Sequence, residues 1–144
     1  MQQAFGFPGS EAKVRDSFAR QSLMATLGAR IEEVRPGRVT IVAPVGANAL
    51  QQQGFGHAGL TFAIGDSAAG YAALSLLEEA AEVMTAEMKI NLMAPAAGER
   101  LIAEGWVVRS GRRLVVVQAR VLAETGADRV EVAILQGTMV PVLL

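Results

Sequence analysis

The sequence predicts an α+β fold in which an antiparallel sheet of about six strands surrounds one long central helix. Residues 57–77 are rich in alanine, lack proline and are apolar on nearly every side, which is typical of a helix enclosed by other elements. Long strand candidates follow them, separated by short turns that favour antiparallel neighbours. The 144 residues are expected to form one domain, in which residues 1–27 are a helical extension and residues 28–142 the core.

Before the core, Ser10 is expected to cap a helix over residues 11–27, with Gly28 as its stop. Its apolar side would carry Val14, Phe18, Leu23, Met24 and Leu27. Residues 30–34 and 38–43 are then predicted to form a hairpin around the turn Pro36-Gly37. A polar, glycine-bearing approach, residues 51–56, leads into the central helix.

Four strand candidates follow the central helix. They are residues 85–93, 101–109, 114–123 and 130–140. In the first, Glu87, Lys89 and Asn91 alternate with Met88, Ile90 and Leu92, which indicates a half-buried strand. Glycine-bearing turns separate the later three, so that the whole chain reads helix, two strands, helix and four strands.

The composition limits the classes of partner and site. Charged residues are 19% of the chain and the net charge is −1, so nucleic acid or an anionic membrane is not expected as the main partner. No cysteine is present, which excludes disulfides and thiolate chemistry and makes the cytoplasm the default compartment. With a single histidine, a histidine-rich metal site is not expected either. No signal peptide is visible, and Asp66 and Ser67 interrupt the apolar stretch, so no membrane insertion is expected.

Asp66 is the one formally charged residue between Arg38 and Glu78. Burial of an unpaired carboxylate costs roughly several kcal/mol of folding free energy. A buried aspartate is therefore usually hydrogen-bonded or takes part in catalysis. Two interpretations therefore stay open: an aspartate bonded to a nearby backbone or hydroxyl group, and a catalytic carboxylate.

An ordered set of residues around Asp66 resembles a family signature. The set is Gln51, Gly54, His57, Ala58, Gly59 and Asp66. It is similar to the signature of hotdog-fold acyl-CoA thioesterases of the phenylacetate-pathway (PaaI-like) and hydroxybenzoyl-CoA types: Asn or Gln, then His-Gly-Gly, then an acid nine residues after the histidine. Later segments that fit are residues 88–95, Gly98-Glu99, residues 109–113 and Gly137-Thr138.

The resemblance covers residues 28–142 and implies a hotdog fold, in which a curled sheet encloses a central helix. It also implies hydrolysis of an acyl- or aryl-CoA to a free acid and CoA, without metal or redox cofactor. Two rivals remain: a hotdog hydratase or dehydratase acting on a thioester, and a protein that binds acyl-CoA without turnover. The spacing of His57 and Asp66 fits the thioesterase pattern better than the hydratase pattern.

The resemblance also implies roles for single residues. Asp66 would be the nucleophile or the general base, Gln51 would orient the water or the thioester oxygen, and Thr85 would hold the attacking water. The alternatives are a solvated loop residue for Gln51 and an ordinary strand threonine for Thr85. Gly59 is a further site residue that the signature implies. His57 is expected to shape the turn into the helix by hydrogen bonds rather than to transfer protons.

Ala58 would polarise the thioester carbonyl with its amide, because the first turn of a helix has free N–H groups and the positive end of the dipole. The family usually has glycine there, and alanine adds a methyl group where the substrate approaches. Ala58 and Asp66 are eight residues apart, about 12 Å along one helix, so both cannot reach one carbonyl carbon from the same chain. If both act on one thioester, Asp66 must come from a second subunit, and the active unit would be a homodimer with two equivalent sites at its interface. The resemblance likewise implies dimers or tetramers built as dimers of dimers.

Arg109, Gly111, Arg112 and Arg113 form a basic turn that would bind the phosphates of CoA. The alternative is a solvated hairpin tip. Phe62 is a candidate for the wall of the acyl pocket.

Overall fold

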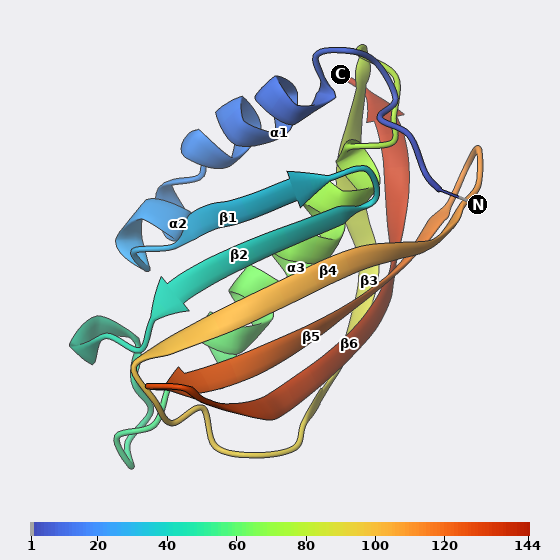
Figure 1. Cartoon of the computed structure of the whole chain (residues 1–144). Coiled ribbons are helices and arrows are strands. Elements are labelled where there is room, and N and C mark those ends of the chain that lie inside the picture. The colour runs from blue at the N-terminus through green and yellow to red at the C-terminus, as the bar shows by residue number, and fades with distance from the viewer. Residues whose placement is uncertain (1) are drawn as a thin grey trace.

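The computed structural model describes residues 2–144 and shows a six-stranded sheet curled around one long helix (Figure 1). The sheet order is β1-β2-β4-β5-β6-β3, and all neighbours are antiparallel. The helices are α1 (Ser10–Ala19), α2 (Ser22–Thr26), the short 3-10 helix η1 (Ala47–Ala49) and α3 (Ala58–Leu74). The strands are β1 (Arg30–Arg35), β2 (Arg38–Pro44), β3 (Ala81–Leu92), β4 (Arg100–Ser110), β5 (Val115–Thr125) and β6 (Asp128–Leu143). The predicted α+β hotdog architecture is confirmed.

Helix α3 lies on the concave side of the sheet and supplies the centre of the core. Ile64, Ala68 and Ala72 recur every four residues, lie on one face of the helix and are fully buried. The helix approaches β4 so closely that a Cβ on Gly105 would lie 2.3 Å from the carbonyl carbon of Ala68. Only glycine fits at that crossing, so Gly105 fixes how deeply α3 sits in the sheet.

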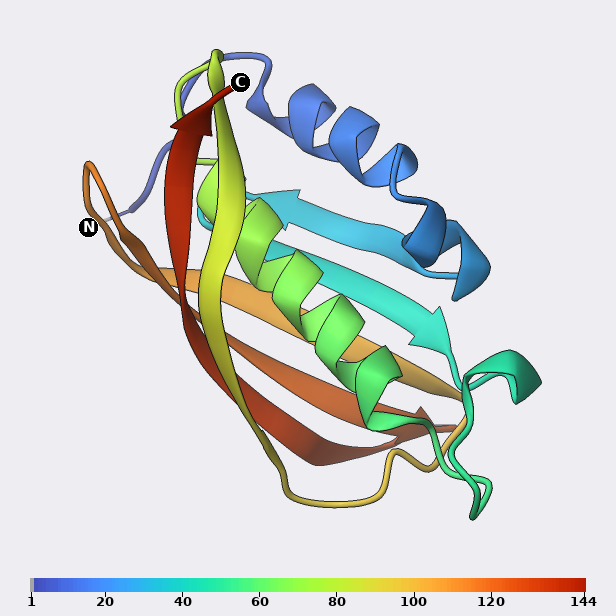
Figure 2. The same cartoon turned by 180° about the vertical axis from the view of Figure 1, so that it is seen from behind.

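The opposite face of α3 is open, which corrects the expectation that the helix is surrounded. Figure 2 shows this face unobstructed between β3 and the first hairpin. Phe62 is 36% exposed, and Asp66 is half-buried. Strand β3 lies at one edge of the sheet, and its Met84 is 57% exposed. Within one chain, therefore, the curled sheet covers only one side of a helix that is apolar all round.

The N-terminal extension is two helices rather than one. Residue Gln21 adopts an extended conformation between α1 and α2, although neither proline nor glycine marks the break. The break lets both Val14 and Met24 point into the core, where each is at most 1% exposed. Ser10 is not the cap: it is the first helical residue, Gly9 occupies the cap position, and the Ser10 hydroxyl accepts the N–H of Phe7.

The predicted strands are present with small differences at their ends. Helix α3 ends at Leu74, earlier than residue 77, and β3 already begins at Ala81. The register of β3 against β6 shifts between Thr85 and Glu87. A bulge beside a candidate site residue is a common way to aim a side chain off the regular sheet direction.

None of the helices in residues 2–144 has the length and hydropathy needed to cross a membrane.

Candidate functional site

The start of α3 is capped by a histidine. His57 has an extended backbone (φ −60°, ψ 143°), and its Nδ1 accepts the N–H of Gly59 at 2.7 Å. This is the hydrogen bond that the expected structural role of His57 requires. Because the N–H of Gly59 is engaged inside the chain, the free donor at this helix end is the N–H of Ala58, the first helical residue.

Gln51 lies beside Ala58, on the wall of the same cavity of about 390 Å³. Its side-chain oxygen accepts hydrogen bonds from the backbone N–H groups of Gln53 and Phe55, at 2.5 and 3.2 Å. These bonds hold the side chain of Gln51 against the loop that follows it. Its nitrogen donates to the Oε1 of Gln53 at 3.1 Å and retains a second N–H. We call Gln51 and Ala58 the helix-end site.

Asp66 projects from the middle of α3 and meets Thr85 of β3. The Thr85 hydroxyl donates a hydrogen bond to Oδ1 of Asp66 at 2.8 Å. Two residues that were predicted separately from the sequence are therefore in direct contact. Burial raises the pKa of Asp66 above its ordinary value, and the hydrogen bond from Thr85 partly opposes that rise in pKa. A carboxylate with a raised pKa is a stronger base. We call Asp66 and Thr85 the carboxylate site.

The two sites are separate within one chain. They line different cavities, and α3 runs unbroken from Ala58 past Asp66. Eight residues of helix span about 12 Å along the axis. The structure thus brings Gln51 to Ala58 and Thr85 to Asp66, and it keeps the two pairs apart.

Three residues at the carboxylate site were not predicted from the sequence. Ser17 and Gln21 of the N-terminal extension, with Tyr71 of α3, line the same cavity of about 250 Å³ as Asp66. Gln21 donates to the Tyr71 hydroxyl at 2.6 Å, and the Ser17 hydroxyl lies 3.2 Å from it. Tyr71, the one tyrosine of the chain, was a signal within the apolar helix, but no pattern indicated that residues 17 and 21 pack beside it.

The predicted CoA-binding turn lies between β4 and β5. Arg109, Arg112 and Arg113 are exposed, and Gly111 donates its N–H to the carbonyl of Leu114 at 2.9 Å, which tightens the turn. Among residues 2–144, no ion pair engages these three arginines. Their charges are therefore available to an anionic ligand, although the turn touches neither the helix-end nor the carboxylate cavity.

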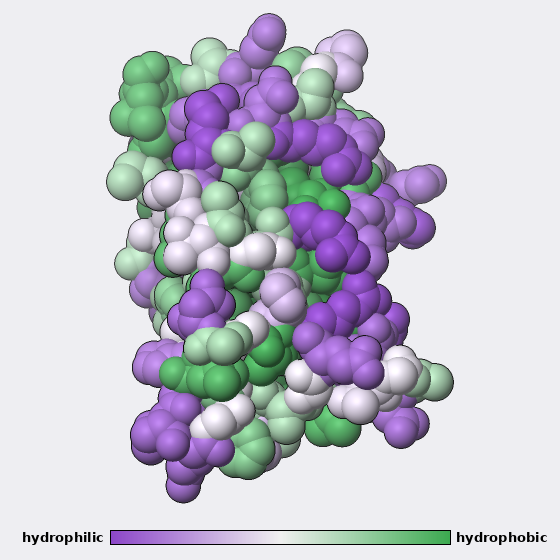
Figure 3. Space-filling view, turned by 90° about the vertical axis from the view of Figure 1, so that its left-hand side faces the viewer, coloured by the Kyte–Doolittle hydropathy of each residue, from purple (hydrophilic) through white to green (hydrophobic). Residues whose placement is uncertain are grey.

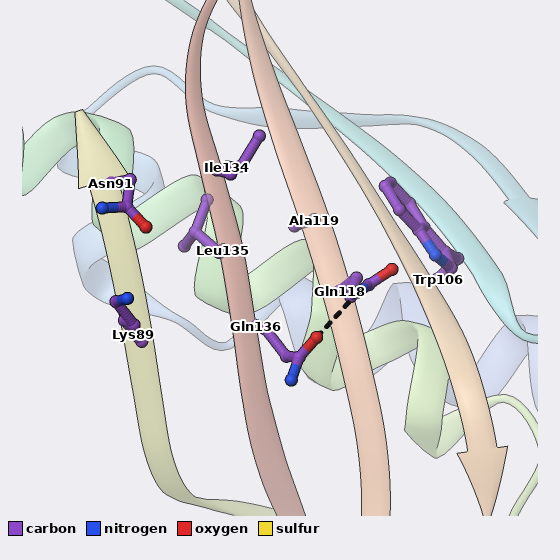
Figure 4. A pocket seen from close by; sticks show the side chains of 8 residues that line it. All are labelled: Lys89, Asn91, Trp106, Gln118, Ala119, Ile134, Leu135 and Gln136. Carbon is purple, nitrogen blue, oxygen red and sulfur yellow. Dashed lines mark hydrogen bonds between the residues drawn. The ribbon is translucent and has the colours of Figure 1, made fainter. Parts of the chain in front are cut away.

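Of two further cavities, one contains no predicted site residue and the other reaches the start of α3. Figure 4 shows one of about 350 Å³ on the sheet, where Gln118 donates to Gln136 at 2.8 Å near Trp106 and Lys89. It holds neither a carboxylate nor a hydroxyl that would serve hydrolysis. The other cavity is apolar, is walled by Leu23 and Leu60, and reaches His57 and Gly59. Apolar side chains also gather in a hollow on the side of the molecule that carries α1 and α2 (Figure 3).

No three His, Cys, Asp or Glu side chains in residues 2–144 are grouped as ligands for a metal ion.

Comparisons with known proteins identify the family and the fold. A family model described as the thioesterase superfamily matches residues 53–129. The structure of a thioesterase family protein from Silicibacter pomeroyi is 46% identical and covers 94% of this chain and 100% of its own, with a TM-score of 0.92. The Escherichia coli PaaI protein, from the phenylacetic acid degradation operon, has the same fold (TM-score 0.83, 20% identity, 92% and 93% covered). A Saccharolobus solfataricus protein that bears the name of an esterase is 27% identical over 108 residues, 75% of this chain and 71% of its own.

Proposed function

The chain belongs to the thioesterase superfamily, and on this premise we propose that it hydrolyses the thioester bond of an acyl-CoA to a free acid and CoA. The observation that carries the proposal is the half-buried carboxylate of Asp66, hydrogen-bonded by Thr85 at 2.8 Å on the wall of a polar cavity. Hydrolysis needs a group that activates water or attacks the carbonyl carbon, and we assign either role to Asp66.

In the general-base form of the proposed reaction, Asp66 takes a proton from a water held by Thr85, and the water oxygen attacks the thioester carbon. The carbonyl oxygen becomes an oxyanion, which a helix-end N–H stabilises. The C–S bond then breaks, and the CoA sulfur receives the proton from Asp66. In the nucleophilic form the Asp66 carboxylate attacks the thioester carbon, the C–S bond breaks, and CoA leaves as a thiolate. Water then hydrolyses the mixed anhydride, which regenerates the Asp66 carboxylate and releases the acid, whose proton passes to the CoA sulfur. Both forms use water and protein groups, without a metal or redox cofactor.

The oxyanion donor in this proposal is Ala58 of the partner subunit. Ala58 and Asp66 of one chain lie about 12 Å apart along α3, too far to act on one carbonyl group. A two-fold dimer that pairs the open faces of α3 would join the helix-end site of each chain to the carboxylate site of the other, in two equivalent active sites. The uncovered face of α3 and the exposed edge strand β3 support such an interface.

The turn of Arg109, Gly111, Arg112 and Arg113 is proposed to bind the phosphates of CoA, because its three guanidinium groups are exposed and free of carboxylate partners within residues 2–144. The absence of cysteine supports a reducing compartment such as the cytoplasm for this activity.

Thiol release from a panel of short, medium, long and aryl acyl-CoAs, followed with a colorimetric thiol reagent, tests the proposal. The protein has no cysteine and contributes no background. We expect turnover on part of the panel and a loss of at least about 100-fold in kcat for Asp66→Asn, since general bases contribute on that order. Glu78→Gln, an exposed acid just beyond α3, is the matched control. Silence across the panel with binding retained would instead favour a non-catalytic acyl-CoA-binding protein or a hydratase or dehydratase acting on a thioester, since neither releases a thiol.

A further inference from the structure

Thr61 carries an unpaired hydroxyl near the start of α3. Its side chain is 1% exposed, and over residues 2–144 its Oγ1 is the single buried side-chain oxygen or nitrogen that makes no hydrogen bond within the chain. The hydroxyl of a buried threonine in a helix commonly donates to the carbonyl oxygen four residues earlier. That bond is missing at Thr61, so no internal contact offsets the cost in folding free energy of burying the hydroxyl.

The unpaired hydroxyl belongs to the helix-end site. Thr61 lines the same cavity of about 390 Å³ as Gln51 and Ala58. It follows Ala58 by three residues, which places the two on one face of the helix with their Cβ atoms about 5–6 Å apart. Helical side chains lean toward the N-terminus, where the N–H of Ala58 is free. A backbone donor and a side-chain donor without internal partners therefore share one cavity.

The rest of this cavity has neutral walls. Phe55, Leu92 and Met93 are among its lining residues, and within residues 2–144 no charged side chain lines it. Negative charge that develops here would depend on neutral hydrogen-bond donors, which stabilise it best where water is excluded. One oxygen that accepts two hydrogen bonds of about 2.9 Å can bridge donors roughly 5 Å apart. The first turn of α3 thus offers two donors at a spacing that suits a single oxygen.

We propose that the Thr61 hydroxyl donates a hydrogen bond to the thioester carbonyl oxygen of the substrate, as a second donor beside the Ala58 N–H. This inference rests on the proposed function and deepens it by assigning a further catalytic residue. The bond strengthens as the carbonyl oxygen becomes an oxyanion, so the hydroxyl lowers the barrier more than it improves substrate binding. The folded protein keeps a buried, unpaired donor because the substrate supplies its acceptor.

Thiol release from Thr61→Val and Thr61→Ser tests the assignment. Valine has nearly the same shape as threonine but no hydroxyl, so we expect kcat to fall at least about tenfold with KM changed less than about twofold. Serine keeps the hydroxyl and should retain most of the wild-type kcat. Thr40→Val is the matched control and should keep the wild-type kcat. Thr40 lies on β2 between the buried Val39 and Ile41, so its side chain is on the outer face of the sheet.

Stability distinguishes a catalytic hydroxyl from a structural one. Thr61→Val removes an unpaired polar group from a buried position, so the midpoint of chemical denaturation should be unchanged or higher than that of the wild type. A lower midpoint together with a lower kcat, or a failure of serine to restore kcat, would overturn the inference. Thr61→Ala replaces Thr61→Val in the kinetic and infrared measurements if circular dichroism shows that the valine variant does not fold.

A carbonyl probe tests the hydrogen bond without turnover. The probe is an analogue of hexanoyl-CoA in which CH₂ replaces the thioester sulfur, so that its isotope-labelled carbonyl group cannot be hydrolysed. A hydrogen bond to a carbonyl oxygen weakens the C=O bond and lowers its infrared stretching frequency. The frequency of the bound probe should therefore be higher in Thr61→Val than in the wild type and Thr61→Ser.

The outcomes separate this inference from the function on which it rests. Turnover with equal kcat in the wild type and Thr61→Val, or an equal carbonyl frequency, would overturn the inference and leave the hydrolase intact. If no acyl-CoA releases thiol, the proposed function fails, and the carbonyl frequency alone decides the inference. A higher frequency in Thr61→Val would then support it, whereas an equal frequency or no binding of the probe would overturn it.

Discussion

The helix-end site and the carboxylate site lie on one helix but are built in opposite ways. At the helix-end site the chemistry comes from the backbone: the free N–H belongs to exposed Ala58, and Gln51 is held by its own loop. At the carboxylate site it comes from a side chain, Asp66, whose pKa is raised by burial. In the proposed reaction, one site would bind developing negative charge and the other would supply a base. The separation teaches that the two groups of residues, which the proposal makes two halves of an active site, can each be changed without touching the other.

The largest expected effect comes from removing the helix-end donor by Ala58→Pro. Proline is well accepted as the first residue of a helix, and His57 already has the extended backbone that must precede it. The substitution deletes one N–H and leaves the carboxylate site intact. We expect kcat to fall about 10²–10³-fold, as when other enzymes lose an oxyanion donor. Thiol-release kinetics measure this effect.

Ala58→Gly is the control for that variant, because it keeps the N–H and removes the methyl group. Its kcat should stay near the wild-type value, with any gain confined to bulky acyl groups. Equal activity of Ala58→Pro and wild type would show that the backbone of this helix end takes no part in the reaction.

A heterodimer of two different inactive variants tests whether the helix-end site of one chain works with the carboxylate site of the other. In a dimer of one Asp66→Asn chain and one Ala58→Pro chain, one active site receives both wild-type groups and the other receives neither. Purified heterodimers, obtained by co-expression with two different tags, should recover about half of the wild-type activity. Each homodimer should remain inactive. No recovery in a stable heterodimer would mean that the two halves act within a single chain.

Thr85→Val tests whether the hydrogen bond from Thr85 lowers the pKa of Asp66. The hydrogen bond from Thr85 lowers the pKa of Asp66, while burial raises it, so removal of the hydroxyl leaves burial unopposed and the pKa rises further. In the proposed reaction, activity requires ionised Asp66. The acid limb of kcat/KM against pH should therefore move to higher pH, with the largest loss of activity below neutrality. Thr85→Ser, which keeps the hydroxyl, should retain the wild-type limb, and an unmoved limb in Thr85→Val would contradict the assignment.

The smallest effect is expected at the cap of α3. His57→Ala removes the acceptor of the Gly59 N–H and should lower the free energy of unfolding by about 1 kcal/mol, whereas His57→Asn, a good cap, should restore most of it. Chemical denaturation measures both. A loss of kcat with unchanged stability in His57→Asn would instead give His57 a direct part in the chemistry.

Much of this molecule could be predicted from its sequence because its signals are local. Alternation in the later strands, the Pro36-Gly37 turn and the alanine-rich helix are patterns of neighbouring residues. So is the ordered set from Gln51 to Asp66. The distance argument for two halves also needed only the rise of a helix, and the unbroken α3 confirms the separation on which it depends.

What the sequence could not show depends on contacts between distant segments. The break at Gln21 lacks a helix-breaking residue and follows from burying Val14 and Met24 together. The open face of α3 could not be predicted from a helix that is apolar all round, because the curl of the sheet decides which side is covered.

The sequence by itself determined the strands, the central helix, their order and the residues that resemble the thioesterase signature, since periodicity and spacing belong to the chain alone. Only the tertiary structure decided which groups meet. It joined Thr85 to Asp66 across 19 positions and Gln21 to Tyr71 across 50, and such pairings are set by how α3 packs against β3 and the N-terminal extension. The physical reason is that the functional group of a side chain is given by the residue type, whereas the groups that it contacts depend on how distant segments pack together.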